Sequence, residues 1–298
     1  MIQKMVIRRC VHAGSWYPGT KKSLLEALEV YFTDKEFGPG EVPTTLNNEK
    51  RTIIGGVSPH AGMTYSAPCA AYTYLNLFKE KIPDTIIVLG TDHIGFRKIA
   101  LLAEGEWETP LGNLSIDNEL SEAIVKSSKI IEDDKSLFIG HSEQEHNIEI
   151  QLPFIKYCSL GEEVKIVTIK IAGTKDFKVI NEIANDISRA IISSNKDVVI
   201  VASSDMSHKQ VNNKEQLEKF KKIDLDVIDA FKILDPEKTL NRALQTSICG
   251  PQTITTMMLI SKNLNATHGE LLKYYASSER TGRIDGYCVG YFSGITKI

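Results

Sequence analysis

The sequence predicts an α/β fold: a single domain with a mostly parallel, mixed sheet flanked by helices. Strand-like and helix-like patterns alternate almost to the end of the chain, which is typical of this class. Three apolar runs rich in Ile and Val have the composition of strands buried on both faces. Each run leads through a small-residue turn to a histidine, and these segments are residues 52–60, 85–93 and 198–208. Ligands of open α/β sheets bind beyond the carboxyl ends of the strands, where these histidines would meet.

The elements around the first two histidine strands follow from caps, breakers and periodicity. Helix starts are marked by Thr20 and Asp117, whose side chains can accept hydrogen bonds from a first helical turn. Gly, Pro and Asn mark a loop. The expected order is a helix after Thr20, a loop over 38–51, a helix over about 67–79, a strand over 99–103 that could run antiparallel, and a helix from Asp117 to about residue 128.

The second half of the chain continues the alternation. A strand and a helix with isoleucines three and four residues apart precede the third histidine strand, and the longest helix follows it. Gly250-Pro251 opens a late helix, because proline is tolerated in the first turn. These elements are expected over 164–171, 180–191, 217–234, from 251 onward, and in a last strand over 287–295. Without repeats or a linker, residues 1–298 are predicted to form one domain.

Composition excludes several classes of function. The chain has 298 residues and a formal net charge of −3, with basic and acidic residues interspersed, so nucleic-acid binding is not expected. No apolar run approaches the roughly 20 residues of a membrane helix, and the start lacks a secretory signal. The five cysteines are scattered without a Cys-x-x-Cys pair. We therefore expect a reduced, cytoplasmic protein without a disulfide framework.

Two of the strand-end histidines lie in constrained turns. His60 follows a proline, which restricts the residue before it, and precedes Gly62, which permits a tight reversal. His93 lies in a similar turn, where Asp92 could instead cap a helix. Neutral imidazole is the commonest metal ligand, so the two histidines could supply half of a coordination sphere. The alternative for each is a structural histidine bonded to a nearby carbonyl group.

The third strand-end histidine, His208, has a carboxylate close by in the sequence. Asp205, three residues earlier, could orient the imidazole or act as a ligand, or it could bond backbone amides in a turn. Cys249 precedes Gly250-Pro251 at a predicted helix N-terminus, where the helix dipole favours thiolate. It is therefore a candidate nucleophile or soft metal ligand, although an isolated cysteine is more often buried filler.

Other polar and aromatic residues could line the same site. One set near the middle of the chain, which could contact a substrate or support the site or could belong to a capped surface helix, is His141, Glu145 and His146. Another set near the start, which could wall a pocket or pin the N-terminal arm, is His12, Trp16 and Tyr17.

Taken together, these motifs resemble the Memo family over nearly the whole chain. The matching segments are His-Ala-Gly-Ser-Trp-Tyr at 12–17, Pro-His-Ala-Gly-x-Thr-Tyr at 59–65, Gly-x-x-His at 90–93, Thr-Pro-Leu at 109–111, Glu-His-x-Ile-Glu at 145–149, Leu-Pro at 152–153, Ser-Ser-Asp-x-x-His at 203–208 and Ile-Cys-Gly at 248–250. The family shares its fold with the class III extradiol dioxygenases, which hold Fe(II) with two histidines and a glutamate. The resemblance implies that His60 and His93 are ligands, that Cys249 replaces the carboxylate, and that His208 is the remaining active-site histidine.

The leading hypothesis is a metal-dependent, dioxygenase-like oxidoreductase. Iron is the first expectation for the metal, with copper or zinc as alternatives, because thiolate shifts preference toward softer metals. His208 would move a proton with help from Asp205, and an open coordination position would take O₂ or substrate. Resemblance to prokaryotic members implies a radical-SAM protein as a partner.

Two other functions stay open from the sequence. One is a non-catalytic adaptor, whose cleft would bind a peptide or its anionic group. The other is a zinc hydrolase with three histidine ligands and Glu145 as the base.

Overall fold

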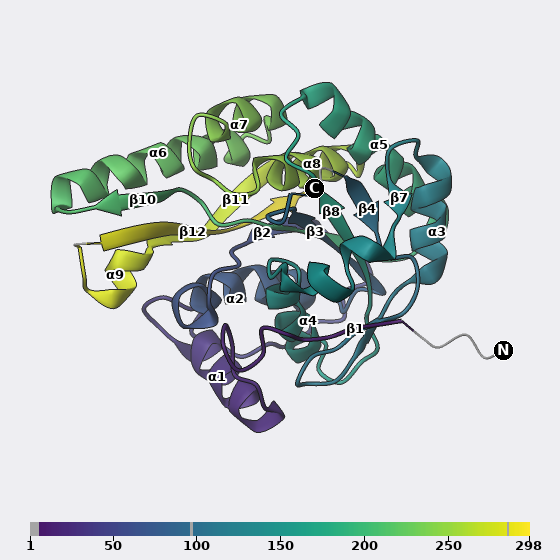
Figure 1. Ribbon diagram of the computed structural model, residues 1–298, viewed down its shortest axis with the longest axis horizontal. Helices are drawn as coiled ribbons and strands as arrows, with labels where there is room; N and C mark the ends of the chain where they lie inside the picture. Colours follow the sequence, from purple (N-terminus) through teal and green to yellow (C-terminus); the bar gives the residue numbers. More distant parts are fainter. Residues whose placement is uncertain (1–5, 96–97, 285) are drawn as a thin grey trace.

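A nine-stranded mixed sheet with helices on both faces forms the centre of this computed structural model, which describes residues 6–95, 98–284 and 286–298 (Figure 1). The parallel core has four neighbouring strands in the order β2 (Ile53–Ser58), β9 (Val198–Ser203), β3 (Thr85–Thr91) and β8 (Lys165–Ile171). All residues of β2, β3 and β9 are buried, as their apolar runs predicted. The predicted fold class is therefore confirmed, and the three histidine strands are immediate neighbours.

Antiparallel strands extend this core on both sides. On one side, β12 (Gly286–Lys297) pairs antiparallel with β2, with β10 (His208–Val211) and with β11 (His268–Ala276). On the other side, β4 (Ile99–Leu101) pairs antiparallel with β8, and β7 (Glu132–Asp133) pairs parallel with β4. A separate small sheet contains β1 (Ile7–Arg8), β5 (Glu106–Trp107) and β6 (Leu114–Ser115). Strand β11 was not predicted, because its middle residues are only partly buried and show no clean alternation.

Alternate residues of the parallel strands face two separate cores. Ile87 and Ile200 pack under helices on one face, and Ile86 and Val199 pack under helices on the other. The first face carries α3 (Asn118–Ser127), α5 (Phe177–Ser194), α6 (Lys214–Lys232), α7 (Pro236–Ala243) and α8 (Pro251–Asn263), and the second carries α1 (Lys21–Thr33), α2 (Met63–Lys79) and α4 (Leu152–Cys158) (Figure 1). Shorter helices are α9 (Ser277–Thr281), η1 (Lys135–Leu137), η2 (Gly140–Gln144) and η3 (Glu149–Gln151).

The helix caps agree with the sequence except at the start of α2. Thr20 and Asp117 accept hydrogen bonds from the first turns of α1 and α3, as predicted. Helix α2 begins at Met63, about four residues earlier than expected, and contains Pro68. Proline removes the hydrogen bond to the carbonyl group four residues before it, and the Arg280 side chain donates to this Thr64 oxygen at 2.7 Å. A distant arginine therefore satisfies the carbonyl oxygen that Pro68 leaves without its helical hydrogen bond.

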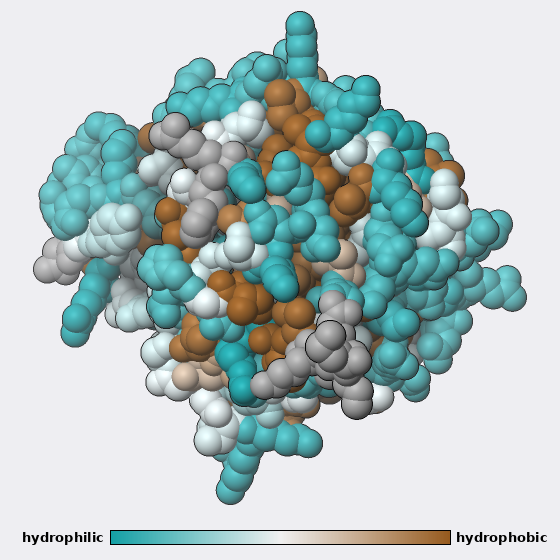
Figure 2. Space-filling model, turned by 45° about the vertical axis from the view of Figure 1, so that its right-hand side comes forward, coloured by the Kyte–Doolittle hydropathy of each residue, from teal (hydrophilic) through white to brown (hydrophobic). Residues whose placement is uncertain are grey.

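Most of the surface shown in Figure 2 is hydrophilic. Apolar residues form a broken band across this face, interrupted and bordered by hydrophilic side chains. None of the helices in the described ranges is both long and apolar enough to cross a membrane.

Candidate metal-binding site

Three side chains meet beyond the carboxyl ends of the parallel strands. His60 follows β2, His93 follows β3, and Cys249 lies just before α8. One potential ligand atom from each lies within 4.8 Å of the other two, and we call this set the imidazole–sulfur group. The Cys249 Sγ is 3.1 Å from His60 Nε2, and the two imidazole centroids are 5.5 Å apart. The strand ends therefore bring nitrogen and sulfur atoms to a common point.

His60 is held on two sides and is 2% exposed. Its Nδ1 lies 2.9 Å from the Ser203 Oγ at the end of β9, and its backbone N–H donates to Asp205 at 2.8 Å. Burial lowers the pKa of His60 to about 4, more than the nearby Asp205 carboxylate raises it. His60 is therefore a neutral imidazole whose Nε2 faces the sulfur atom.

Glu145 holds His93 in the same way. Its carboxylate accepts from the His93 backbone N–H at 2.6 Å and from Nδ1 at 2.9 Å. Burial alone would raise the pKa of Glu145, but the hydrogen bond and charge of His93 outweigh it and lower the pKa to about 2. Because an ionised carboxylate only accepts, Nδ1 of His93 carries the proton and Nε2 remains available as a ligand atom.

Cys249 differs from the expectation for a helix N-terminus. Burial and the Asp205 carboxylate raise the pKa of the Cys249 thiol well above its ordinary value. The backbone N–H of Asp205, 3.2 Å from Sγ, and the Ser204 hydroxyl, at 3.7 Å, oppose this rise but do not offset it. In the metal-free protein burial therefore favours the thiol over the thiolate, against the trend expected at a helix N-terminus. A metal ion would have to displace the thiol proton.

Asp205 connects the imidazole–sulfur group to His208. One carboxylate oxygen accepts from the backbone N–H groups of His60 and Ala61, and the other lies 3.7 Å from His208 Nε2. Burial lowers the pKa of His208, but the Asp205 carboxylate more than compensates, so the net pKa lies above its ordinary value. The opposite ring nitrogen, Nδ1, donates to the Ser247 carbonyl oxygen at 3.1 Å. His208 is thus set up to hold a proton.

The N-terminal arm forms one wall of the site. The His146 ring stacks between His93, at 5.1 Å, and Trp16, at 4.2 Å between centroids. Tyr17 is buried and donates to Glu149 at 2.8 Å, and the His12 backbone N–H donates to the same oxygen at 2.9 Å. Both alternatives for the arm therefore hold: Trp16 walls the site and Tyr17 pins the arm.

Arg8 and Glu149 shape this wall, and no motif pointed to Arg8. The buried Arg8 guanidinium pairs with Glu149 and donates to the carbonyl oxygens of Glu143 and Glu145. It thereby fixes the chain between η2 and η3, where a surface helix was one expectation. That expectation is wrong, because Glu145 and Glu149 are buried and His146 lies between short 3₁₀ helices. His141 is exposed on η2, and among the described residues it does not belong to either group whose potential ligand atoms converge.

A second set of potential ligand atoms overlaps the first. His93, Glu145 and His146 also offer atoms within 4.8 Å of one another. The Glu145 oxygens, however, already accept from two groups of His93 and from the backbone N–H groups of His146 and Asn147. This set therefore supports His93 rather than offering free ligand atoms.

A cleft of about 850 Å³ opens beside the imidazole–sulfur group. Asp205, His208 and Trp16, which contact this group or its neighbours, line the cleft together with Arg283 and aromatic residues such as Tyr287. The cleft gives a small molecule or a chain segment access to His208.

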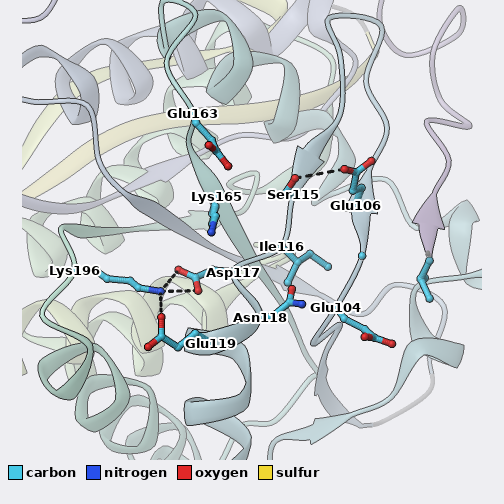
Figure 3. A pocket seen from close by; sticks show the side chains of 12 residues that line it. Glu104, Glu106, Ser115, Ile116, Asp117, Asn118, Glu119, Glu163, Lys165 and Lys196 are labelled. Carbon is cyan, nitrogen blue, oxygen red and sulfur yellow. Dashed lines mark hydrogen bonds and ion pairs between the residues drawn. The ribbon is translucent and has the colours of Figure 1, made fainter. Parts of the chain in front are cut away.

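Another pocket, of about 640 Å³, lies at the opposite, amino ends of the parallel strands (Figure 3). Its buried carboxylate, Asp117, accepts from Lys196 at 2.8 and 2.9 Å, and Lys196 also pairs with Glu119 at 2.9 Å. No histidine or cysteine is among the described residues that line it.

Comparisons with known proteins place the chain in a family. A MEMO1 family protein of Desulfurococcus amylolyticus is 38% identical over 95% of this chain and 96% of its own. MEMO1 family proteins of Nitrosopumilus maritimus (35% identical, 96% and 98% covered) and Methanobrevibacter smithii (32%, 98% and 100%) are similar. The uncharacterized protein JW3007 from Escherichia coli K12 shares the fold at a TM-score of 0.50, with 12% identity over 80% of this chain and 99% of its own. The Memo-like protein family model matches residues 8–295, so the chain belongs to the Memo-like family.

Proposed function

We propose that this protein is a metal-dependent redox enzyme in which His60, His93 and Cys249 hold a redox-active metal ion. The observation that carries the proposal is the convergence of three ligand atoms within 4.8 Å. Each imidazole is bonded through Nδ1 to a protein oxygen, which orients the ring and leaves Nε2 for a metal. This pattern of support behind the ligand is typical of metal sites and is not required of structural histidines.

The donor set fits a transition metal. Two imidazoles and one sulfur suit iron, copper or zinc better than the hard cations Mg²⁺ or Ca²⁺. We infer iron first and copper second, because a redox role requires a metal that changes oxidation state. When bound, such an ion would polarise a ligand and exchange electrons with it.

His208 and Asp205 supply the acid–base part of the proposal. His208 lines the cleft, and its raised pKa means that it carries a proton near neutral pH more readily than a free imidazole. Asp205 stabilises that proton at His208 Nε2 and also fixes the backbone of His60. The Asp205 carboxylate therefore holds the proton donor, His208, in a fixed position relative to the imidazole of His60.

The test is the metal content of protein purified without oxygen. We expect iron or copper near one equivalent in the wild type and a loss of most of it in Cys249→Ala, because one of three ligands is removed. Cys158→Ala is the matched control: Cys158 is also a free cysteine, but it is the last residue of α4 and lies buried in the core. Equal metal content in Cys249→Ala and Cys158→Ala would rule out the ligand set.

The cleft favours a second candidate, a binding protein for a peptide or small molecule. Its volume of about 850 Å³ and its wall of Trp16, Tyr65 and Tyr287 would hold a ligand without turnover. Binding that survives both Cys249→Ala and metal removal would support this candidate. The zinc hydrolase has no such support, because Glu145 is engaged by His93 and His208 points its ring nitrogens at Asp205 and Ser247.

A further inference from the structure

Ser203 lies directly behind His60 and is fully buried at the carboxyl end of β9. Its hydroxyl oxygen is 2.9 Å from His60 Nδ1. A hydroxyl can donate or accept, so this contact alone leaves open which ring nitrogen of His60 carries the proton. The answer matters, because only an unprotonated Nε2 can bind a metal beside Cys249.

Gln151 fixes the first part of the answer. Its Oε1 accepts from the Tyr74 hydroxyl at 2.8 Å, and its Nε2 donates to the Pro59 carbonyl oxygen at 3.0 Å. A carbonyl oxygen never donates, so the orientation of the amide is determined. The remaining N–H of Gln151 points to Ser203 Oγ at 2.9 Å, and Ser203 must accept this bond.

The carbonyl oxygen of Asn147 fixes the second part. It lies 2.7 Å from Ser203 Oγ and accepts the single hydroxyl proton. Ser203 then has only a lone pair left for His60, so Nδ1 of His60 must carry the proton. If Ser203 instead donated to His60 Nδ1, the Asn147 carbonyl oxygen would lose its hydrogen bond from the hydroxyl group. The proton of His60 would then lie on Nε2, against the Cys249 thiol 3.1 Å away.

We propose that Ser203 is a positioning residue that fixes the proton of His60 on Nδ1 and so leaves Nε2 free to bind a metal, with Gln151 setting the direction of the hydrogen bonds. The consequence for metal binding rests on the proposed function. The tautomer itself does not, because it is a property of the metal-free protein. Histidine tautomers are commonly set by the bond that the other ring nitrogen makes.

The experiment is long-range ¹H–¹⁵N NMR on metal-free, ¹⁵N-histidine-labelled protein. The chain has seven histidines, and His60→Gln identifies the His60 signals by their disappearance. We expect the Nδ1–H tautomer in the wild type and a shift toward Nε2–H in Ser203→Ala. Ser293→Ala is the matched control, because Ser293 is an equally buried strand serine whose hydroxyl bonds Thr73 and not a histidine.

Metal titration of the same variants gives a second result. We expect Ser203→Ala to bind the metal 10- to 100-fold more weakly than Ser293→Ala, the usual effect of losing support behind a ligand. A wild-type spectrum showing His60 with its proton on Nε2 would overturn the proposal, and this spectrum can be recorded even if Ser203→Ala does not fold. If the wild type has the Nδ1–H tautomer but does not bind metal, the positioning role is supported and the proposed function is contradicted.

Discussion

The two edges of the parallel sheet both carry polar pockets, but they differ in which side-chain atoms remain available after the hydrogen bonds within the protein are made. At the amino edge, Asp117 accepts from Thr85, Lys196 and the backbone of α3, and Lys196 also pairs with Glu119 (Figure 3). At the carboxyl edge, each bond to an imidazole occupies one ring nitrogen and leaves the other facing the imidazole–sulfur group. The potential ligand atoms that remain available at the carboxyl edge are the difference that bears on metal binding.

Strand β8 has a lysine near each end, so the environments of the two edges can be compared through one residue type. Lys165, at the amino edge, is exposed, whereas Lys170, near the carboxyl edge, is buried and donates to the Leu137 carbonyl oxygen. Burial lowers the pKa of Lys170 to about 8, more than Glu145 and Asp92 raise it. The unfolded chain therefore binds the extra proton up to about pH 10.5, and the folded protein loses it near pH 8.

The largest expected effect follows from that difference. Between pH 8 and 10.5 the unfolded state binds more protons, so the free energy of unfolding should rise with pH. Across this window, the free energy of unfolding of the wild type should rise by about 3 kcal/mol more than that of Lys170→Met. Urea unfolding at several pH values measures both curves. Lys165→Met should follow the wild-type curve. Parallel pH curves for Lys170→Met and the wild type would show that the Lys170 pKa is ordinary.

A second prediction removes support from the carboxyl edge. Glu145→Gln keeps the shape of the side chain but removes the charged acceptor that holds the backbone N–H and Nδ1 of His93. We expect metal affinity to fall about 10- to 100-fold, measured by competition with a chromophoric chelator. Glu143→Gln lies on the same segment but bonds the Arg9 backbone instead of a ligand, and it should bind metal like the wild type. If both variants bind metal equally, Glu145 does not support His93.

The smallest expected effect is at the amino edge. Asp117→Asn keeps a capping side chain for α3 but leaves Lys196 without its buried partner, so the free energy of unfolding should fall by about 1 kcal/mol. Metal affinity should not change. Glu119→Gln, whose side chain is 83% exposed, should have a smaller effect on stability. Weaker metal binding in Asp117→Asn would contradict the separation of the two edges.

The sequence predicted the parallel core well because burial on both faces leaves an unmistakable apolar run. It also placed His60, His93 and His208 at strand ends, and Thr20 and Asp117 at caps, because these signals are local. It missed the early start of α2, where the Thr64 carbonyl oxygen accepts a hydrogen bond from Arg280, more than two hundred residues away. Strand β11 had no clean alternation to detect.

The supports of the site were not predictable for a different reason. Ser203 and Gln151 are 52 residues apart, and their importance arises only when β9 and η3 pack together. Nothing about either residue type signals a bond to a histidine. The sequence showed that Cys249 lies at a helix N-terminus, which favours thiolate, but it did not show the burial that favours the thiol. Local pattern therefore located the potential ligand atoms, and tertiary packing determines where their protons lie.

The three members of the imidazole–sulfur group are widely spaced along the chain, at positions 60, 93 and 249. During synthesis both nitrogen donors leave the ribosome more than 150 residues before the sulfur donor does. Before Cys249 is synthesised, a nascent chain holds two of the three members, and the full set exists only after α8 has docked. Under the proposed function, a metal ion would therefore find its complete ligand set only after most of the polypeptide had been made and packed.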